Sequence, residues 1–192
     1  MVLGLFAFPL WWPLVNTPPP RETLPGLDAL PPEEQAVIEQ IAAEDRAFAE
    51  ALIATGLMGP APVPEDEQAM PQMQGATVYA TGTFTQVDAV RWARGTVTVY
   101  QEIDGSWVLR FEEFEVRNGP QLHVFLSAHP EPRTPEEVRV EGLGFDWGPL
   151  KGTVGDQHYR LPPEFDMGAV QSVVIFSLTF QEVFSSAELI RQ

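Results

Sequence analysis

The chain has 192 residues, which is enough for one domain of ordinary size and additional segments. Its formal net charge of −16 would be repelled by a phosphate backbone, so we expect no nucleic-acid partner. The sequence contains no cysteine, which excludes disulfides, thiolate metal sites and cysteine nucleophiles.

The chain begins with an uncharged apolar run from Val2 to Val15. Its 14 residues fall short of the roughly 20 that a helix needs to cross a bilayer. Trp11 and Trp12 are typical of a membrane interface. No basic residue precedes the run and no small-residue cleavage site follows it, which argues against a cleaved signal peptide. We predict that residues 1–15 are the tail of an N-terminal membrane anchor. The alternative is a hydrophobic arm that packs on its own domain.

Residues 16–75 are expected to form a Pro-rich acidic spacer. Residues 21–67 hold eleven acidic residues against two arginines. One helix is predicted from about Pro32 to Thr55, because proline suits the first helical turn and apolar residues recur at helical spacing. These apolar residues are Val37, Ile41, Phe48 and Leu52. Gly56 is expected to end the helix, and residues 57–75 to form a linker.

Residues 76–192 show the alternation and turn residues of a β-domain. Asp104-Gly105 predicts a hairpin between two strands. The apolar positions change parity after Phe111, which predicts a bulge at Glu112-Glu113. Asn118-Gly119-Pro120 predicts a turn. Residues 128–148 are expected to be a long connection without a strand, including the stretch GLGFDWG at its end.

The last two strands are predicted at about residues 172–180 and 182–190. Several short strands separated by turns predict an all-β fold, an antiparallel β-sandwich or barrel, preceded by the N-terminal apolar segment and one α-helix. In the first of these strands, Val174 and Phe176 belong to one strongly apolar face, which Phe184 continues. Ser177 lies on the other face, at the rim of the core, where we expect its hydroxyl to bond a backbone group or water.

Few side chains are candidates for catalysis or for binding a ligand or metal. Lys151 is the only lysine, and it would pair with a nearby acid or reach an anionic ligand. Tyr159 shares a strand face with Gln157 and is expected to pack its ring and hydrogen-bond its hydroxyl. None of the three histidines stands at a metal-ligand spacing. We therefore expect no metal site and no catalytic residue, and no motif implies a cofactor.

Five stretches in order resemble the DM-thirteen domain, a small β-domain also found beside DOMON domains. They are TGTF at 81–84, GTVTVYQ at 95–101, LRFEEFEVRNGPQLHVFLS at 109–127, GPLKGTVGDQHYRLP at 148–162 and VVIFSLTFQEVFSSAEL at 173–189. The resemblance implies a β-fold and a proposed role in electron transfer. It also implies functional positions at Asn118, Gly119, Pro120, Lys151, Gly152, Gly155, Gln157, Tyr159 and Ser177.

Ser177 occupies the position where the family pattern has a cysteine. Serine cannot form a thiolate or a sulfenic acid, so the residue on which a redox role depends is absent. Bacterial relatives tend to place a membrane anchor and an acidic helical spacer before the domain, as this chain does. We therefore expect a membrane-tethered, extracytoplasmic β-domain with a non-enzymatic binding or structural role and a possible protein partner. The alternative is an accessory electron-transfer module.

Overall fold

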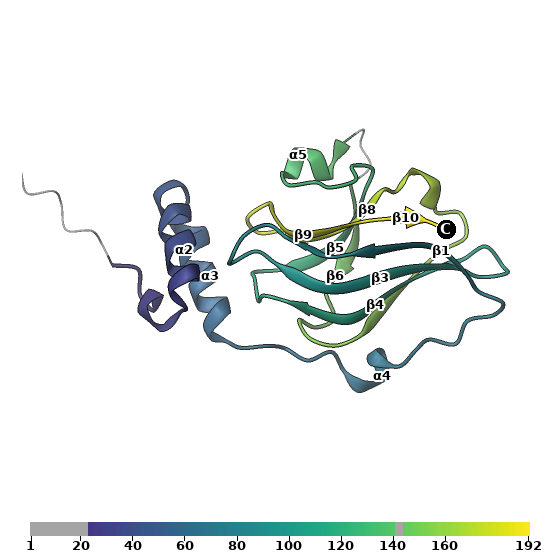
Figure 1. Cartoon of the computed structure of the whole chain (residues 1–192), viewed down its shortest axis with the longest axis horizontal. Coiled ribbons are helices and arrows are strands. Elements are labelled where there is room, and N and C mark those ends of the chain that lie inside the picture. The colour runs from purple at the N-terminus through teal and green to yellow at the C-terminus, as the bar shows by residue number, and fades with distance from the viewer. Residues whose placement is uncertain (1–22, 141–143) are drawn as a thin grey trace, which may run out of the picture.

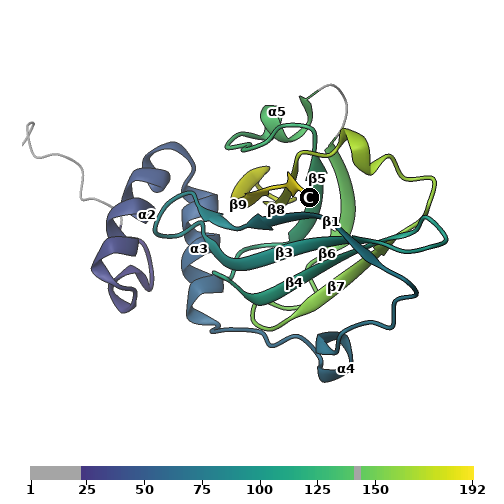
Figure 2. The same ribbon diagram turned by 45° about the vertical axis from the view of Figure 1, so that its right-hand side comes forward.

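The computed structural model describes residues 23–140 and 144–192, so the predicted anchor at residues 1–15 lies outside the described residues. Figure 1 shows two layers of β-strands, with a pair of helices at one end of the sandwich. A long segment that carries a short helix runs from these helices along the sheets to the first strand (Figure 2).

The predicted helix at residues 32–55 is divided into two helices, α2 (Pro32–Glu44) and α3 (Arg46–Leu57). The break is at Asp45, whose extended backbone (φ −137°, ψ 95°) cannot continue a helix. Its carboxylate instead accepts a hydrogen bond from the Phe48 N–H at 2.9 Å and caps α3. The apolar stripe is therefore folded into a helical hairpin rather than extended along one rod. Two short helical turns flank it, η1 (Leu27–Ala29) before and α4 (Glu65–Gln68) after.

Within the described residues, ten strands form two five-stranded antiparallel sheets. The first sheet has the order β10-β1-β3-β4-β7 and the second the order β2-β9-β8-β5-β6. The strands are β1 (Thr77–Thr83), β2 (Thr85–Gln86), β3 (Ala93–Gln101), β4 (Trp107–Val116), β5 (Leu122–Ser127), β6 (Gly144–Pro149), β7 (Gln157–Leu161), β8 (Ser172–Ser177), β9 (Glu182–Glu188) and β10 (Ile190–Arg191). The two sheets are not closed on each other, so the predicted all-β fold is confirmed as a sandwich and not a barrel.

The predicted hairpin and bulge are both present in the first sheet. Gly105 has φ 88° in the turn between β3 and β4, a conformation that favours glycine. Thr96 pairs with Glu112 and Arg94 pairs with Glu115, so β4 carries one extra residue. Glu113 has φ 52° at this point. The bulge explains why apolar residues change parity along β4 and still reach the same core.

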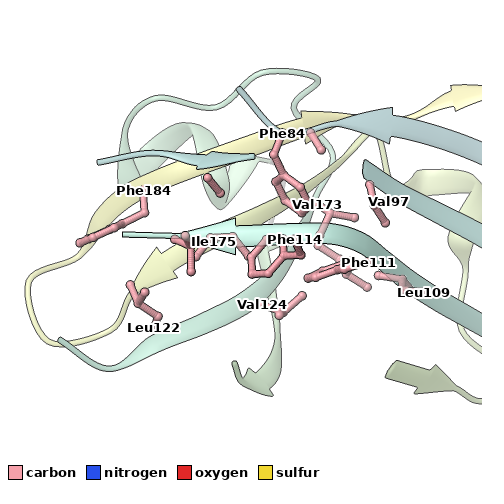
Figure 3. Close-up of a cluster of buried hydrophobic side chains, with 14 of the residues drawn as sticks. Phe84, Val97, Leu109, Phe111, Phe114, Leu122, Val124, Val173, Ile175 and Phe184 are labelled. Atoms are coloured by element: carbon pink, nitrogen blue, oxygen red, sulfur yellow. The ribbon is translucent and has the colours of Figure 1, made fainter. Parts of the chain in front are cut away.

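The core between the sheets is built largely from aromatic and branched side chains. Figure 3 shows Phe111 and Phe114 from β4 facing Val124, Val173 and Ile175 of the second sheet. Phe111 and Phe114 lie with their ring centroids 5.2 Å apart. Both are almost completely buried. The strands alternate as a sandwich requires, with one face of each sheet turned inward.

The two faces of β8 are separated as the sequence predicts, but Phe184 does not continue the face of Val174 and Phe176. Val173 and Ile175 face the inter-sheet core, whereas Val174 and Phe176 belong to a second cluster on the other side of the sheet. The excursion that contains α5 (Pro135–Val138) supplies Val138 to this cluster. Phe184 nevertheless faces the inter-sheet core. A register shift between Ile175 and Phe176 in the β8–β9 pairing changes the parity.

The stretch GLGFDWG was predicted to be a loop, and this prediction is wrong for its second half. Gly144–Pro149 forms β6, the edge strand of the second sheet, which pairs with β5. Phe145 and Trp147 both contact the Phe165 ring, at centroid distances of 5.4 and 5.5 Å. These contacts stabilise a strand that contains glycine. Its alternation of apolar and polar residues is too short to predict a strand from the sequence.

Candidate functional site

Ser177 lies at the end of β8 and is completely buried. Its hydroxyl donates a hydrogen bond to the Pro120 carbonyl at 2.7 Å. The expected bond to a backbone group is therefore present. Ser177 pairs with Leu122 and Glu182 within a continuous sheet, so no turn presents the hydroxyl to solvent. The side chain joins the turn before β5 to the end of β8.

The helical hairpin and the segment that follows it are bound to the sandwich at the turn Asn118-Gly119-Pro120. The Asn118 carbonyl accepts a hydrogen bond from the Thr55 hydroxyl at 3.2 Å, and the Asn118 amide donates to the Gly59 carbonyl. A Cβ atom at Gly119 would lie 2.3 Å from the Phe184 ring. Glycine is therefore required by close packing, not by a positive φ.

Arg117 was not singled out from the sequence, and its side chain links both helices to the sandwich. Its side chain is only 5% exposed and pairs with Glu34 of α2 at 2.7 Å. The same guanidinium donates to the Leu52 carbonyl of α3 at 3.2 Å. A Cβ atom at Gly56 would lie 2.5 Å from Arg117 Nη2. Gly56 lies within α3 and makes room for this arginine, so it is not the predicted helix stop.

The GPLKG motif leads into a loop that is fixed by a buried polar network. The Lys151 N–H donates to Gln157 Oε1 at 3.1 Å and to the Tyr159 hydroxyl oxygen at 3.2 Å. The Tyr159 hydroxyl donates to Gln157 Oε1 at 2.8 Å, and Gln157 Nε2 donates to the Gly152 carbonyl at 3.2 Å. Burial raises the pKa of Tyr159 far above its usual value, so the phenol stays neutral at physiological pH.

Gly152 and Gly155 lie against the segment that connects α3 to β1. We call residues 59–75 the strap. A Cβ atom at Gly152 would lie 2.6 Å from the Val63 N atom of the strap. Gly155 has φ 116°, and a Cβ there would lie 3.3 Å from the Gln68 side chain. Gly152 allows close approach of the strap backbone, and Gly155 adopts a left-handed conformation next to strap side chains.

The Lys151 ammonium forms an ion pair with Glu67 of the strap. The hydrogen bond from Lys151 lowers the pKa of Glu67. His158 Nδ1 lies 3.2 Å from the Glu67 carbonyl oxygen. Desolvation, with the charge of Lys151 nearby, lowers the pKa of His158. The sequence left two roles open for Lys151, an ion pair with a nearby acid or contact with an anionic ligand. The structure shows the ion pair.

Two further cations of the site were missed from the sequence. The Arg110 guanidinium is 3% exposed, pairs with Asp156 at 2.7 Å and donates to the Gln68 carbonyl at 2.8 Å. Arg160 donates to the Gln72 carbonyl at 2.6 Å. These arginines lie on β4 and β7, far from the strap in sequence. The only sequence signal for these arginines was the alternation of charged residues with apolar ones along the strands. Every strand with one solvated face shows this alternation, so it did not identify a site.

The family-motif positions thus form two groups. One group is the turn at residues 118–120 together with Ser177, and this turn binds the helical hairpin. The other group is the loop from Lys151 to Tyr159, and this loop binds the strap. Among the described residues, no three His, Cys, Asp or Glu side chains gather in a way that could hold a metal ion. No helix in residues 23–140 or 144–192 is long and apolar enough to cross a membrane.

These features define a small antiparallel β-sandwich whose motif residues hold an N-terminal helical and extended segment. A family model described as "Electron transfer DM13" matches residues 83–189, which is more than half of the chain. The chain belongs to this DM13 family. No curated protein matches it, and neither does any solved structure.

Proposed function

We propose that the protein is a membrane-tethered DM13 domain outside the cytoplasm, with a non-enzymatic role in binding or structure. The observation that carries this proposal is the Ser177 hydroxyl. It is buried and donates to the Pro120 carbonyl, at the position where the family pattern has a redox-capable thiol. The function of this position in the chain is to join two segments of the sandwich.

The remaining family-motif side chains support the same proposal. Asn118 bonds the segment that follows α3, Lys151 pairs with the strap, and Gln157 and Tyr159 bond each other. Each of these polar groups is used to hold the chain's own backbone or a neighbouring side chain. A helical hairpin fixed to the sandwich is suited to hold the domain in a defined orientation next to an anchor.

The apolar run from Val2 to Val15 and its tandem tryptophans support the membrane attachment. Fractionation of cells that express the full chain tests it. We expect the protein in the membrane fraction after a high-salt wash, and degradation of the β-domain when protease is added outside the cytoplasmic membrane. Recovery in the soluble cytosolic fraction would overturn the proposal.

The alternative function is an accessory electron-transfer module, which the family description favours. In this chain it would use a bound cofactor or the redox centre of a partner, because no thiol is present. The test is the visible absorbance of protein purified from its own host. A haem, flavin or copper band at near-equal stoichiometry would favour electron transfer, and a colourless protein without a redox wave would exclude electron transfer through a bound cofactor.

A further inference from the structure

The first part of the strap lies on the sandwich as an added segment of extended backbone, and the helical turn α4 follows it. The Val63 N–H donates to the Val154 carbonyl at 2.8 Å, and the Thr153 N–H donates to the Ala61 carbonyl at 2.7 Å. Pro62 and Val154 form a parallel β-bridge. This is the geometry in which a protein recognises an extended peptide through main-chain hydrogen bonds. The strap prolines at positions 60, 62 and 64 favour such an extended conformation.

Few side chains anchor the strap. Val63 is 2% exposed, and Gly152 and Gly155 leave the space that it fills. Glu65, Asp66 and Ala69 are exposed, and Met70 is 49% exposed. An extended segment with one buried apolar residue is typical of a bound peptide, in which pockets for a few side chains give specificity.

The sandwich presents three cationic side chains to the strap in a chain that is strongly acidic as a whole, and Arg110 and Arg160 also pair with Asp156 and Glu102. Arg110, Lys151 and Arg160 are three of the eleven lysines and arginines in a chain of net charge −16. These side chains and His158 all contact the strap. The strap in turn contributes the acidic stretch Glu65-Asp66-Glu67. Arg110 is buried, and its Nε atom has no hydrogen-bond partner within the described chain.

The strap is bounded by two glycines in the left-handed region. Gly59 has φ 74° and Gly75 has φ 56°. Such positions favour glycine, which adopts other conformations at low energetic cost. The segment between them runs along the outside of the sandwich, and no strand of the described residues lies on its far side (Figures 1 and 2). It can therefore leave the surface while the two sheets keep their pairing.

We propose that this surface is a binding site for an acidic segment of a partner protein that begins extended and ends in a helical turn, and that the strap occupies the site in cis. The site accepts an apolar residue with flanking prolines in extended backbone, followed by a helical turn whose carboxylate, four positions after the apolar residue, reaches Lys151. Main-chain carbonyls of the bound segment accept hydrogen bonds from Arg110 and Arg160. This inference rests on the proposed binding role and specifies its ligand. Since a tethered segment competes at an effective concentration of about 1 mM, the partner binds when the strap is weakened or displaced.

The test measures binding of a labelled synthetic peptide of residues 59–75 to the full-length protein in detergent by fluorescence anisotropy. Val63→Asp removes the anchor of the strap in cis and opens the site. We expect this variant to bind the peptide at least tenfold more tightly than the wild-type chain does. Adding Lys151→Glu should reverse the gain, and a peptide carrying Glu67→Lys should restore binding to that double variant. Ile190→Asp is the matched control, an exposed apolar residue away from the strap, and should not open the site.

Glu67→Lys in the full chain is a second way to release the strap, because it breaks the ion pair at a partly exposed position. It also should increase peptide binding. Equal, weak binding by the wild type and both folded variants would overturn the proposal. A wild-type dimer that Lys151→Glu dissociates would also overturn it, in favour of a second copy of this chain as the occupant. Peptide binding by purified protein does not depend on membrane attachment, so a failure here is distinct from a failure of the fractionation test.

Discussion

Arg117 and Glu34 form an ion pair at 2.7 Å across 83 residues of sequence, with 5% and 18% of their side chains exposed. The pair joins the residue after β4 to the first turn of α2. The same guanidinium bonds the Leu52 carbonyl at 3.2 Å. One side chain thus fixes both helices of the hairpin, and the orientation of the N-terminal segment depends on it.

Arg117→Ala should release the hairpin from the sandwich. It leaves the partly buried Glu34 carboxylate without its cationic partner, and breaking a buried pair in this way costs about 3–5 kcal/mol. Denaturant unfolding measures the loss. Arg94→Ala is the control, because Arg94 is 70% exposed in its pair with Glu115 and such pairs contribute about 0–1 kcal/mol. Equal losses for the two variants would contradict the role given to Arg117.

Gly119→Ala should destabilise the sandwich because the added Cβ would lie 2.3 Å from the Phe184 ring. Overpacking of this kind costs about 1–3 kcal/mol, measured as a lower midpoint of thermal or urea unfolding. Gly168→Ala is the control, since its Cβ would meet only the Asp166 side chain, at 3.0 Å. Phe184→Leu should relieve the clash, so the double variant should lose less than the sum of the two single variants. Strict additivity would show that the two residues do not clash.

The strands of the sandwich could be predicted because the residues that specify each strand and turn are neighbours in the sequence. Asp104-Gly105 specifies its turn through the φ of 88° at Gly105. The bulge at Glu113 was visible as a change of parity along one strand. Parity separated the two faces of β8 correctly, but Phe184 was placed with the wrong face, because the neighbouring register shift leaves no mark in the composition.

The contacts of the site could not be predicted because each joins residues that are distant in sequence. Arg110 and Gln68 are 42 residues apart, and Arg160 and Gln72 are 88 apart. The strap has no hydrophobic period, so its Pro-rich composition indicated a linker. The break at Asp45 has neither glycine nor proline to indicate it. It follows from a cap and from tertiary packing such as the contact of Phe48 with Phe180 at 4.9 Å.

Ser177→Cys tests what the missing cysteine would have done. Ser177 is completely buried, and its hydroxyl bond to Pro120 is 2.7 Å long. A thiol is a weaker donor, so we expect a loss of about 1 kcal/mol in unfolding free energy. The new thiol should react with a disulfide reagent only after denaturation, because reactivity requires exposure. Ser177→Ala is the companion variant and should cost about 1–3 kcal/mol by leaving the carbonyl without its donor. Fast reaction of the native cysteine variant would show that this position is accessible to redox chemistry.

Glu67 and Glu182 should give pH dependences of opposite sign. The bond from Lys151 lowers the pKa of Glu67 below 4.5, so its stabilisation is present above pH 4.5 and is lost as the pH falls through the folded-state pKa. Glu67→Gln should therefore be less stable than the wild type at pH 7 and equal to it in strong acid. Desolvation raises the pKa of Glu182 above 4.5, against the attraction of Arg91.

For Glu182 the unfolded state loses its proton first as the pH rises from 4.5, so the wild type loses stability until the folded-state pKa is passed. Glu182→Gln should remove this loss and gain stability relative to the wild type over that interval. Urea unfolding of both variants between pH 3 and pH 7 measures the two slopes. If both differences had the same sign across this range, desolvation would not be the dominant effect at Glu182.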